Sequence, residues 1–167
     1  GLERAWAGRR RLTRYVQGGA GGSWRSGHEN QVETIARLAG FDHWHHQVNR
    51  NLGKLARHSN GLLCHTRASS IEKHPLPGLP GRGMMLVRFG TGDNQLVIVA
   101  THLALSRRTQ FAQLDYLADC LESTQRVVIM GDLNQEGEWL LQQSGLRRLN
   151  LHPIADELPP YPSWQPN

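Results

Sequence analysis

Residues 96–102 read LVIVATH and residues 127–134 read VVIMGDLN, and a helix-length stretch, 107–121, lies between them. Each apolar run is typical of a buried strand, and each runs directly into polar residues. The stretch between them carries apolar residues near helical spacing, namely Phe111, Leu114, Leu117, Ala118 and Leu121. A strand–helix–strand order with short links predicts that the two strands are neighbours in one sheet. We therefore expect His102 and the pair Asp132 and Asn134 at one edge of that sheet.

The polar residues at these strand ends allow two interpretations. Gly-Asp after an apolar strand is commonly a plain turn, and a single histidine at a strand end is commonly structural. In an extended stretch, however, Asp132 and Asn134 project to the same side, because one residue separates them. A carboxylate beside an amide can orient a water, hold a metal or bind a phosphate oxygen, and a histidine can donate to that phosphate. The combination favours a phosphate-cleaving metal site.

This combination resembles the endonuclease/exonuclease/phosphatase superfamily, which includes DNase I-like nucleases, AP endonucleases and sphingomyelinase-type phosphodiesterases. Two motifs carry the resemblance, Thr101-His102-Leu103 and the run from Val128 to Asn134. Three shorter stretches support it: SNGLL at 59–63, GRGMMLV at 81–87 and YPSWQP at 161–166. The resemblance extends over about residues 31–167. It implies an α/β (α+β) fold, a DNase I-like sandwich of two sheets flanked by helices.

The resemblance also implies an activity, the metal-dependent hydrolysis of a phosphoester with Mg²⁺ or Mn²⁺ as cofactor. His102, Asp132 and Asn134 are then the catalytic residues. Asp132 and Asn134 bind the metal, and His102 contacts a non-bridging phosphate oxygen. Asn60 either contacts the phosphate or ties the loop behind it. Two further residues fall where the family contacts its substrate, Arg25 and Asn49.

The sequence departs from the family's pattern in several places. No opening strand with an Asn is visible in residues 1–15. The family's Gln-Glu pair corresponds to Gln17-Gly18, so glycine replaces the metal-binding carboxylate. The family's final Asp-His pair should follow Trp164, but the sequence ends at Asn167. Gln110 stands where the family's helix usually offers an Arg. These departures predict an impaired hydrolase that lacks terminal strands.

Two alternatives to an enzyme follow from the same residues. The first is a non-catalytic nucleic-acid or phosphate binding module, and the second is a non-functional gene fragment. The formal net charge of +5 favours a polyanionic partner such as nucleic acid. The substrate class stays open among DNA, RNA, a lipid headgroup and a small phosphoester, because one scaffold serves many substrates. The oligomeric state is equally open.

Arginines are concentrated before the matched region, and they predict a basic, poorly ordered arm over residues 1–16. Residues 17–167 are expected to form one partial domain. Arg82 is interpreted as ordinary surface charge. The histidines of residues 43–46 lack partners at the spacing that zinc requires.

The remaining pattern predicts further elements and a cellular location. We expect a helix over 30–38 that stops at Gly40, a strand and turn at 41–51, and strands at 59–66 and 84–89. We also expect a proline-rich loop at 75–80, a hairpin turn at 90–94 and a short helix at 137–145. The sequence has only two cysteines, Cys64 and Cys120, which predicts a reduced, cytoplasmic protein. No stretch is apolar enough to cross a membrane.

Overall fold

The computed structural model describes residues 13–18, 30–51, 57–135 and 137–153. In chain order, these residues form β1 (Thr13–Gly18), α1 (Gln31–Ala39), β2 (His43–Asn51), β3 (Arg57–Cys64), β4 (Ser70–Pro75), β5 (Gly83–Phe89), the 3₁₀ helix η1 (Gly92–Asn94), β6 (Leu96–His102), α2 (Arg107–Leu121), β7 (Val127–Asp132), α3 (Gly137–Gln143) and the 3₁₀ helix η2 (Gly145–Leu149). None of the helices in this part of the chain combines the length and apolar character needed to cross a membrane.

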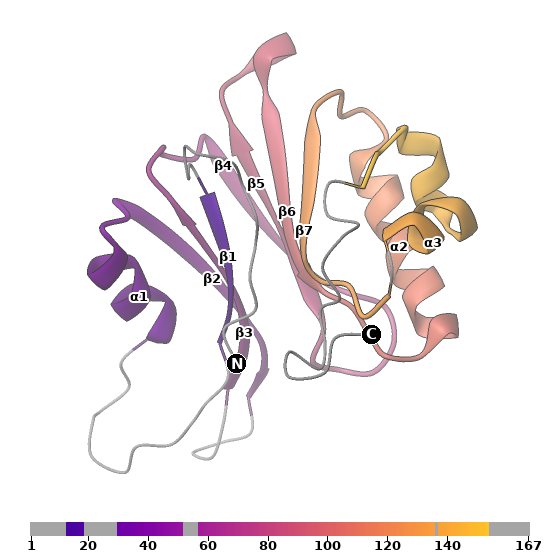
Figure 1. Ribbon diagram of the computed structural model, residues 1–167, viewed down its shortest axis with the longest axis horizontal. Helices are drawn as coiled ribbons and strands as arrows, with labels where there is room; N and C mark the ends of the chain where they lie inside the picture. The colour runs from indigo at the N-terminus through magenta and orange to yellow at the C-terminus, as the bar shows by residue number, and fades with distance from the viewer. Residues whose placement is uncertain (1–12, 19–29, 52–56, 136, 154–167) are drawn as a thin grey trace.

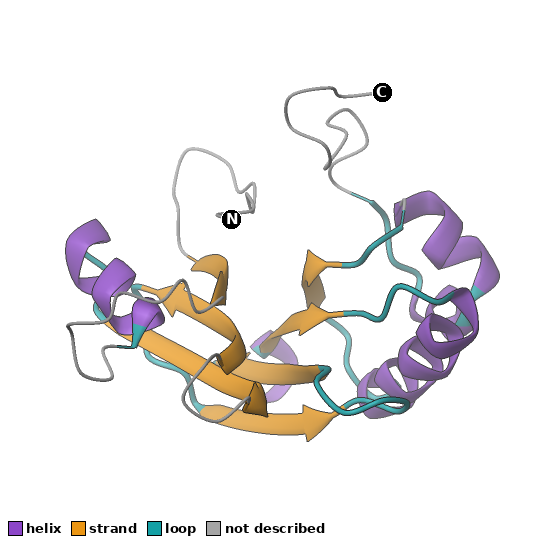
Figure 2. Ribbon diagram, turned by 90° about the horizontal axis from the view of Figure 1, so that it is seen from below, coloured by secondary structure: helices purple, strands orange, loops and turns teal. Residues whose placement is uncertain are grey.

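The strands form two sheets that pack against each other. The first sheet has the order β1-β3-β2 and is antiparallel throughout. The second has the order β4-β5-β6-β7, and its β6 and β7 are parallel. α1 lies on the outer side of the first sheet, whereas α2 and α3 lie on the outer side of the second (Figure 1). Figure 2 shows the same layers from below. This arrangement confirms the predicted sandwich of two sheets flanked by helices.

The buried side chains form one cluster between each pair of layers. β5 shows why, because its alternate residues point to opposite faces of the sheet. Met84 and Leu86 pack toward α2, while Met85 and Val87 pack toward the first sheet. Val32 and Ala36 of α1 pack on Leu63 of β3 in the third cluster. A strand covered on both faces needs a continuous apolar run, which residues 84–87 supply.

The segment from β6 to β7 folds as its sequence predicts. α2 spans the predicted residues 107–121, and the Ser106 side chain caps its start by accepting a bond from Thr109 N. β6 and β7 are parallel neighbours, and their register places His102 opposite Asp132. Both residues therefore lie at one end of the second sheet, which we call the rim.

The other predicted elements have simple local causes. Asn30 caps α1, because its side-chain oxygen accepts a bond from Val32 N at 3.1 Å. Gly40 ends the helix in the left-handed region with φ of 73°, where glycine carries no steric penalty. The predicted turn at 90–94 connects β5 to β6 and contains η1. These findings confirm the helix, its stop and the hairpin.

Two expectations differ from the structure. Residues 70–75 form the edge strand β4, which the sequence analysis missed and whose last residue, Pro75, was assigned to a loop. The strand carries Glu72, Lys73 and Pro75, which suit a sheet edge but weaken the sequence signal for a strand. The expected arm ended at residue 16, yet Thr13–Gly18 form β1 and pair with β3, so that boundary falls inside a strand. Residues 1–12 lie outside the described residues.

Candidate functional site

The rim brings together the ends of β6 and β7. His102 Nε2 lies 3.3 Å from Asp132 Oδ2, and their side chains are 12% and 22% exposed. Gly131 makes this approach possible, because a Cβ at that position would overlap the carbonyl oxygen of Thr101. Its φ of 143° also lies in a region that side chains disfavour. The predicted meeting of the histidine and the aspartate is therefore present in the structure.

Asn134 lies beside Asp132, but through a turn rather than an extended strand. Asn134 has φ of 56°, and its backbone N–H donates to Asp132 Oδ1 at 3.2 Å. Its side-chain Nδ2 donates to the carbonyl of Leu103 at 2.8 Å, which ties the loop after β7 to the loop after β6. The expectation that both side chains project to one side of an extended chain was wrong. An Asx turn brings them together instead.

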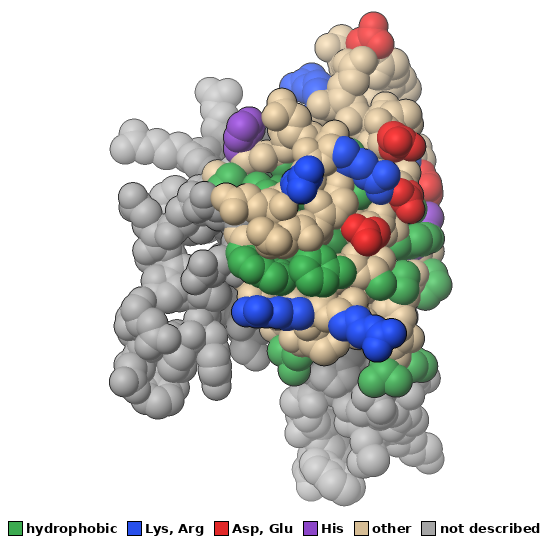
Figure 3. All heavy atoms as spheres, turned by 90° about the vertical axis from the view of Figure 1, so that its right-hand side faces the viewer, with side chains coloured by type: hydrophobic (Ala, Val, Ile, Leu, Met, Phe, Trp, Pro, Cys, Tyr) green, Lys and Arg blue, Asp and Glu red, His purple; other side chains and the backbone are tan. Residues whose placement is uncertain are grey.

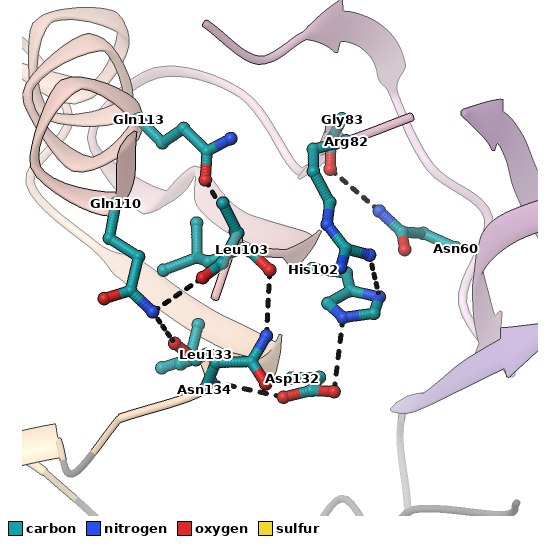
Figure 4. Close-up of polar contacts among 11 residues, drawn as sticks. Asn60, Arg82, Gly83, His102, Leu103, Gln110, Gln113, Asp132, Leu133 and Asn134 are labelled. Atoms are coloured by element: carbon teal, nitrogen blue, oxygen red, sulfur yellow. Dashed lines mark hydrogen bonds and ion pairs between the residues drawn. The ribbon is translucent and has the colours of Figure 1, made fainter. Parts of the chain in front are cut away.

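A fourth rim residue is Arg82, which sequence analysis interpreted as surface charge. Its Nη1 lies 2.9 Å from His102 Nδ1, on the side of the ring away from Asp132 (Figure 4). The row Arg82–His102–Asp132 thus crosses the ends of β5, β6 and β7. The signal in the sequence was the position of Arg82, directly before a buried strand that pairs with the histidine's own strand.

Asn60 lies behind the rim and is 1% exposed. Its Nδ2 donates to the carbonyl of Gly83 at 2.8 Å, and Thr101 Oγ1 donates to the same carbonyl at 3.2 Å. Of the two roles considered for Asn60, these contacts favour tying the loop. The backbone of Gln17 is opposite Asn60 in the first sheet, with Gly18 next to it in β1.

Of the two other expected substrate contacts, Asn49 is the one that the structure describes. Asn49 lies between the sheets, where its Oδ1 and Gln47 Nε2 crowd the position that a Cβ on Gly83 would occupy. Asn49 Oδ1 is buried and has no hydrogen-bond partner within the described part of the chain. Arg25 lies outside the described residues.

Two buried glutamines of α2 organise the rim loops, a role that sequence analysis assigned to neither of them. Gln113 accepts a bond from Ala104 N at 2.9 Å and donates to the carbonyl of Pro77 at 3.0 Å. Gln110 Nε2 donates to the carbonyl of Ala104 at 2.7 Å, with a longer contact of 3.4 Å to that of Leu133. Their signal was available, because both fall on the same helical face as Leu114 and Leu117.

The donor set of the rim fits a divalent metal only weakly. In the residues that the structure describes, no group of three His, Cys, Asp or Glu side chains could hold a metal ion. Asp132 supplies one carboxylate, and Asn134 supplies an amide oxygen, since its nitrogen is used by Leu103. Mg²⁺ is commonly held by one or two carboxylates together with substrate phosphate and water. Asp132 and Asn134 reach the lower limit of that requirement.

Comparison with known proteins gives similarity in fold but not in sequence. No family model matches the sequence, and no curated protein matches it. Among solved structures, TDP2 from Caenorhabditis elegans is similar with a TM-score of 0.50 and 16% identity over 75% of this chain and 38% of that one. The human Nocturnin catalytic domain with bound sulfate has a TM-score of 0.49 and 14% identity, over 65% of this chain and 48% of that one. Sphingomyelinase C from Streptomyces griseocarneus has a TM-score of 0.46 and 16% identity, over 62% and 42%.

The architecture is therefore that of a DNase I-like α/β sandwich. The match to TDP2 supports this assignment of the fold. The chain spans less than half the length of each of the three structures.

Proposed function

We propose that this chain is a domain of a metal-dependent phosphoester hydrolase and that the rim binds the phosphate group of its substrate. The observation that carries the proposal is the contact of His102 with Asp132 on adjacent parallel strands, with Asn134 in the turn that follows. The superfamily fold supports the same class of chemistry. The positive net charge favours a polyanionic substrate, and nucleic acid is the first to test.

Asp132 and Asn134 are the residues that would hold Mg²⁺ or Mn²⁺. When bound, the ion would polarise the phosphate and stabilise the leaving oxygen. Asp132 can also orient a water for attack, because its oxygens already accept bonds that fix the carboxylate plane. Asn134 presents its amide oxygen to the same space, since the carbonyl of Leu103 fixes its nitrogen.

The second candidate function is a non-catalytic module that binds phosphate or nucleic acid at the same rim. It is favoured by the small number of metal ligands among the described residues. A rim with a cation and hydrogen-bond donors can bind phosphate without a metal, and such binding weakens steeply as salt concentration rises.

Hydrolysis of bis(p-nitrophenyl) phosphate separates the two functions. An enzyme is expected to show turnover that requires Mg²⁺, stops with EDTA and is lost in Asp132→Ala. The matched control is Asp93→Ala, which removes a carboxylate from the exposed turn between β5 and β6. Absence of turnover, together with salt-sensitive binding of a labelled single-stranded oligonucleotide, would reject the hydrolase and support the binding module.

A further inference from the structure

Among the described residues, the rim contains one cation, Arg82, that contacts His102 and forms no direct ion pair with a carboxylate. Arg82 makes its contact with a histidine ring, and within the described part of the chain it forms no ion pair with an acidic side chain. We propose that Arg82 is the phosphate-binding cation of the rim and that His102 positions Arg82 and Asp132 rather than contacting the phosphate itself. This inference rests on the proposed function and names the residue that recognises the phosphate.

The hydrogen-bond donors and acceptors in the row Arg82–His102–Asp132 support these roles. A guanidinium group only donates hydrogen bonds, so His102 Nδ1 must accept from Arg82 and carries no hydrogen. The hydrogen of the neutral ring then lies on Nε2, which faces Asp132 Oδ2 at 3.3 Å. Both ring nitrogens are occupied in this arrangement. His102 therefore has no ring N–H left for a phosphate oxygen, whereas Arg82 retains donors beyond the one that it uses.

The backbone at Arg82 is anchored from both sides. The carbonyl of Arg82 accepts a bond from Leu76 N at 3.0 Å. The next carbonyl, that of Gly83, accepts from Asn60 Nδ2 and from Thr101 Oγ1. A site whose supporting residues are already bonded loses little freedom when its ligand binds. The buried side chains of Asn60 and Thr101 therefore fix the start of β5.

Other cations near the rim are arranged differently. The Arg107 guanidinium lies 5.0 Å above the ring of Trp139, a cation–π contact on the α2–α3 side of the molecule. Figure 3 shows the face of α2 and α3, where Lys and Arg side chains flank an apolar band. Gln110, one turn along α2, is uncharged and buried. In the part of the chain that the structure describes, Arg82 is thus the cation that contacts His102.

Arg82 suits a phosphate chemically. A planar guanidinium can donate two parallel hydrogen bonds to phosphate oxygens, which a lysine ammonium cannot match in geometry. One edge of the Arg82 group faces His102, and the remaining N–H groups are available to an anion at the rim. The same cation would act on a phosphomonoester and a phosphodiester, so this contact recognises the phosphate and not the rest of the substrate.

The test measures binding of inorganic phosphate by the full 167-residue chain in EDTA, followed by NMR titration of labelled arginine side chains. We expect Arg82→Gln to weaken phosphate binding by about tenfold or more, as loss of a charge-assisted contact does. Arg126→Gln is the matched control, because Arg126 is exposed at the opposite end of β7 and should leave the affinity unchanged. Arg82→Lys retains the charge and should bind phosphate more tightly than Arg82→Gln.

The outcomes separate this inference from the proposed function, because phosphate binding in EDTA requires no turnover. Equal phosphate affinities in Arg82→Gln and Arg126→Gln would overturn the inference even if the chain hydrolyses a phosphodiester. A hydrogen on His102 Nδ1 in the nitrogen spectrum of the native chain would overturn it as well. Circular dichroism checks that Arg82→Gln folds. If it does not fold, Arg82→Lys is measured in its place. A phosphate affinity of Arg82→Lys equal to that of the native chain would then reject the contact in which Arg82 donates two bonds.

Discussion

Two titratable side chains, Asp132 at the rim and His45 between the sheets, differ in their hydrogen-bond partners. Asp132 accepts at both carboxylate oxygens, from Asn134 N and from the His102 ring. His45, in contrast, lies between the sheets with its Nε2 buried and without a partner among the described residues. Burial lowers the pKa of His45, and the nearby His43 and Lys73 lower it further. The inter-sheet layer therefore favours the neutral ring.

This lowered pKa predicts that acid weakens the fold. The unfolded chain has a histidine of ordinary pKa, near 6.5, and so binds more protons than the folded chain as pH falls below that value. Stability is therefore complete above the unfolded pKa and decreases as pH falls toward the folded pKa. We expect urea denaturation at pH 5 to show lower stability than at pH 7.5. His45→Gln should reduce that difference, and an unchanged difference would contradict the assignment to His45.

Among the helices and strands, those that could be predicted are the ones whose sequence signal lies within the element or directly beside it. The spacing of apolar residues and the residues that cap each helix predict three segments correctly: β6–α2–β7, α1 with its stop at Gly40, and the turn at 90–94. β4 was missed because the charged residues and the proline that suit its place at the sheet edge weaken the local signal for a strand. The turn at Asn134 was missed for a different reason, since the carbonyl of Leu103 stabilises it.

Gly131 allows β7 to approach β6 closely beside the rim. In Gly131→Ala the new methyl group would overlap the carbonyl of Thr101 on β6, so β7 must shift or part from its neighbour. We expect a loss of about 1–3 kcal/mol in the free energy of unfolding, with weaker phosphate binding at the rim. The control is Gly92→Ala, which also has a positive φ but has open space around the position of a Cβ. Equal losses in both variants would show that the close approach of β6 and β7 is not the cause.

At the scale of the whole molecule, the layers determine which predicted site residues could reach the surface. Asn60 and Asn49 come from the first sheet, whose inner face is covered by the second sheet. Their type and position in the sequence suggested substrate contact, but the burial of Asn60 and of the Asn49 Oδ1 atom depends on how two sheets pack and is not visible in either strand alone. His102 and Asp132 could be placed correctly, because parallel neighbours end at the same edge.

The same layering predicts how the two cysteines react. Cys64 is fully buried, and burial raises the pKa of its thiol to about 11. Only the thiolate reacts with alkylating agents, so native Cys64 should be unreactive at pH 8. Cys120 is partly exposed on α2 and should be labelled first. Mass spectrometry after iodoacetamide treatment, with and without urea, measures both rates. Rapid labelling of Cys64 in the native chain would show that the layer between the two sheets opens readily, because Cys64 shares a face of β3 with Leu62.

The last prediction concerns catalysis by the whole chain. One carboxylate and one amide oxygen are the metal ligands that the described rim provides, and catalytic groups that act as a unit lose most of the rate when members are missing. We therefore expect slow turnover of bis(p-nitrophenyl) phosphate at low millimolar Mg²⁺, which EDTA and Asp132→Ala should still abolish. Any rate should rise with Mg²⁺ concentration without saturating, because the ion is weakly held.

A Mg²⁺ titration of the initial rate tests this expectation, with EDTA and Asp132→Ala as controls. Saturation in the micromolar range, abolished by both controls, would contradict it and show that the ion has a further acidic ligand. Glu136 is the first residue to substitute in that case, because it follows Asn134 by two positions in the sequence. A rate lost in Glu136→Gln but retained in Asp93→Asn would identify that ligand, since a carboxylate beside Asp132 supplies the second negative charge that Mg²⁺ binding commonly requires.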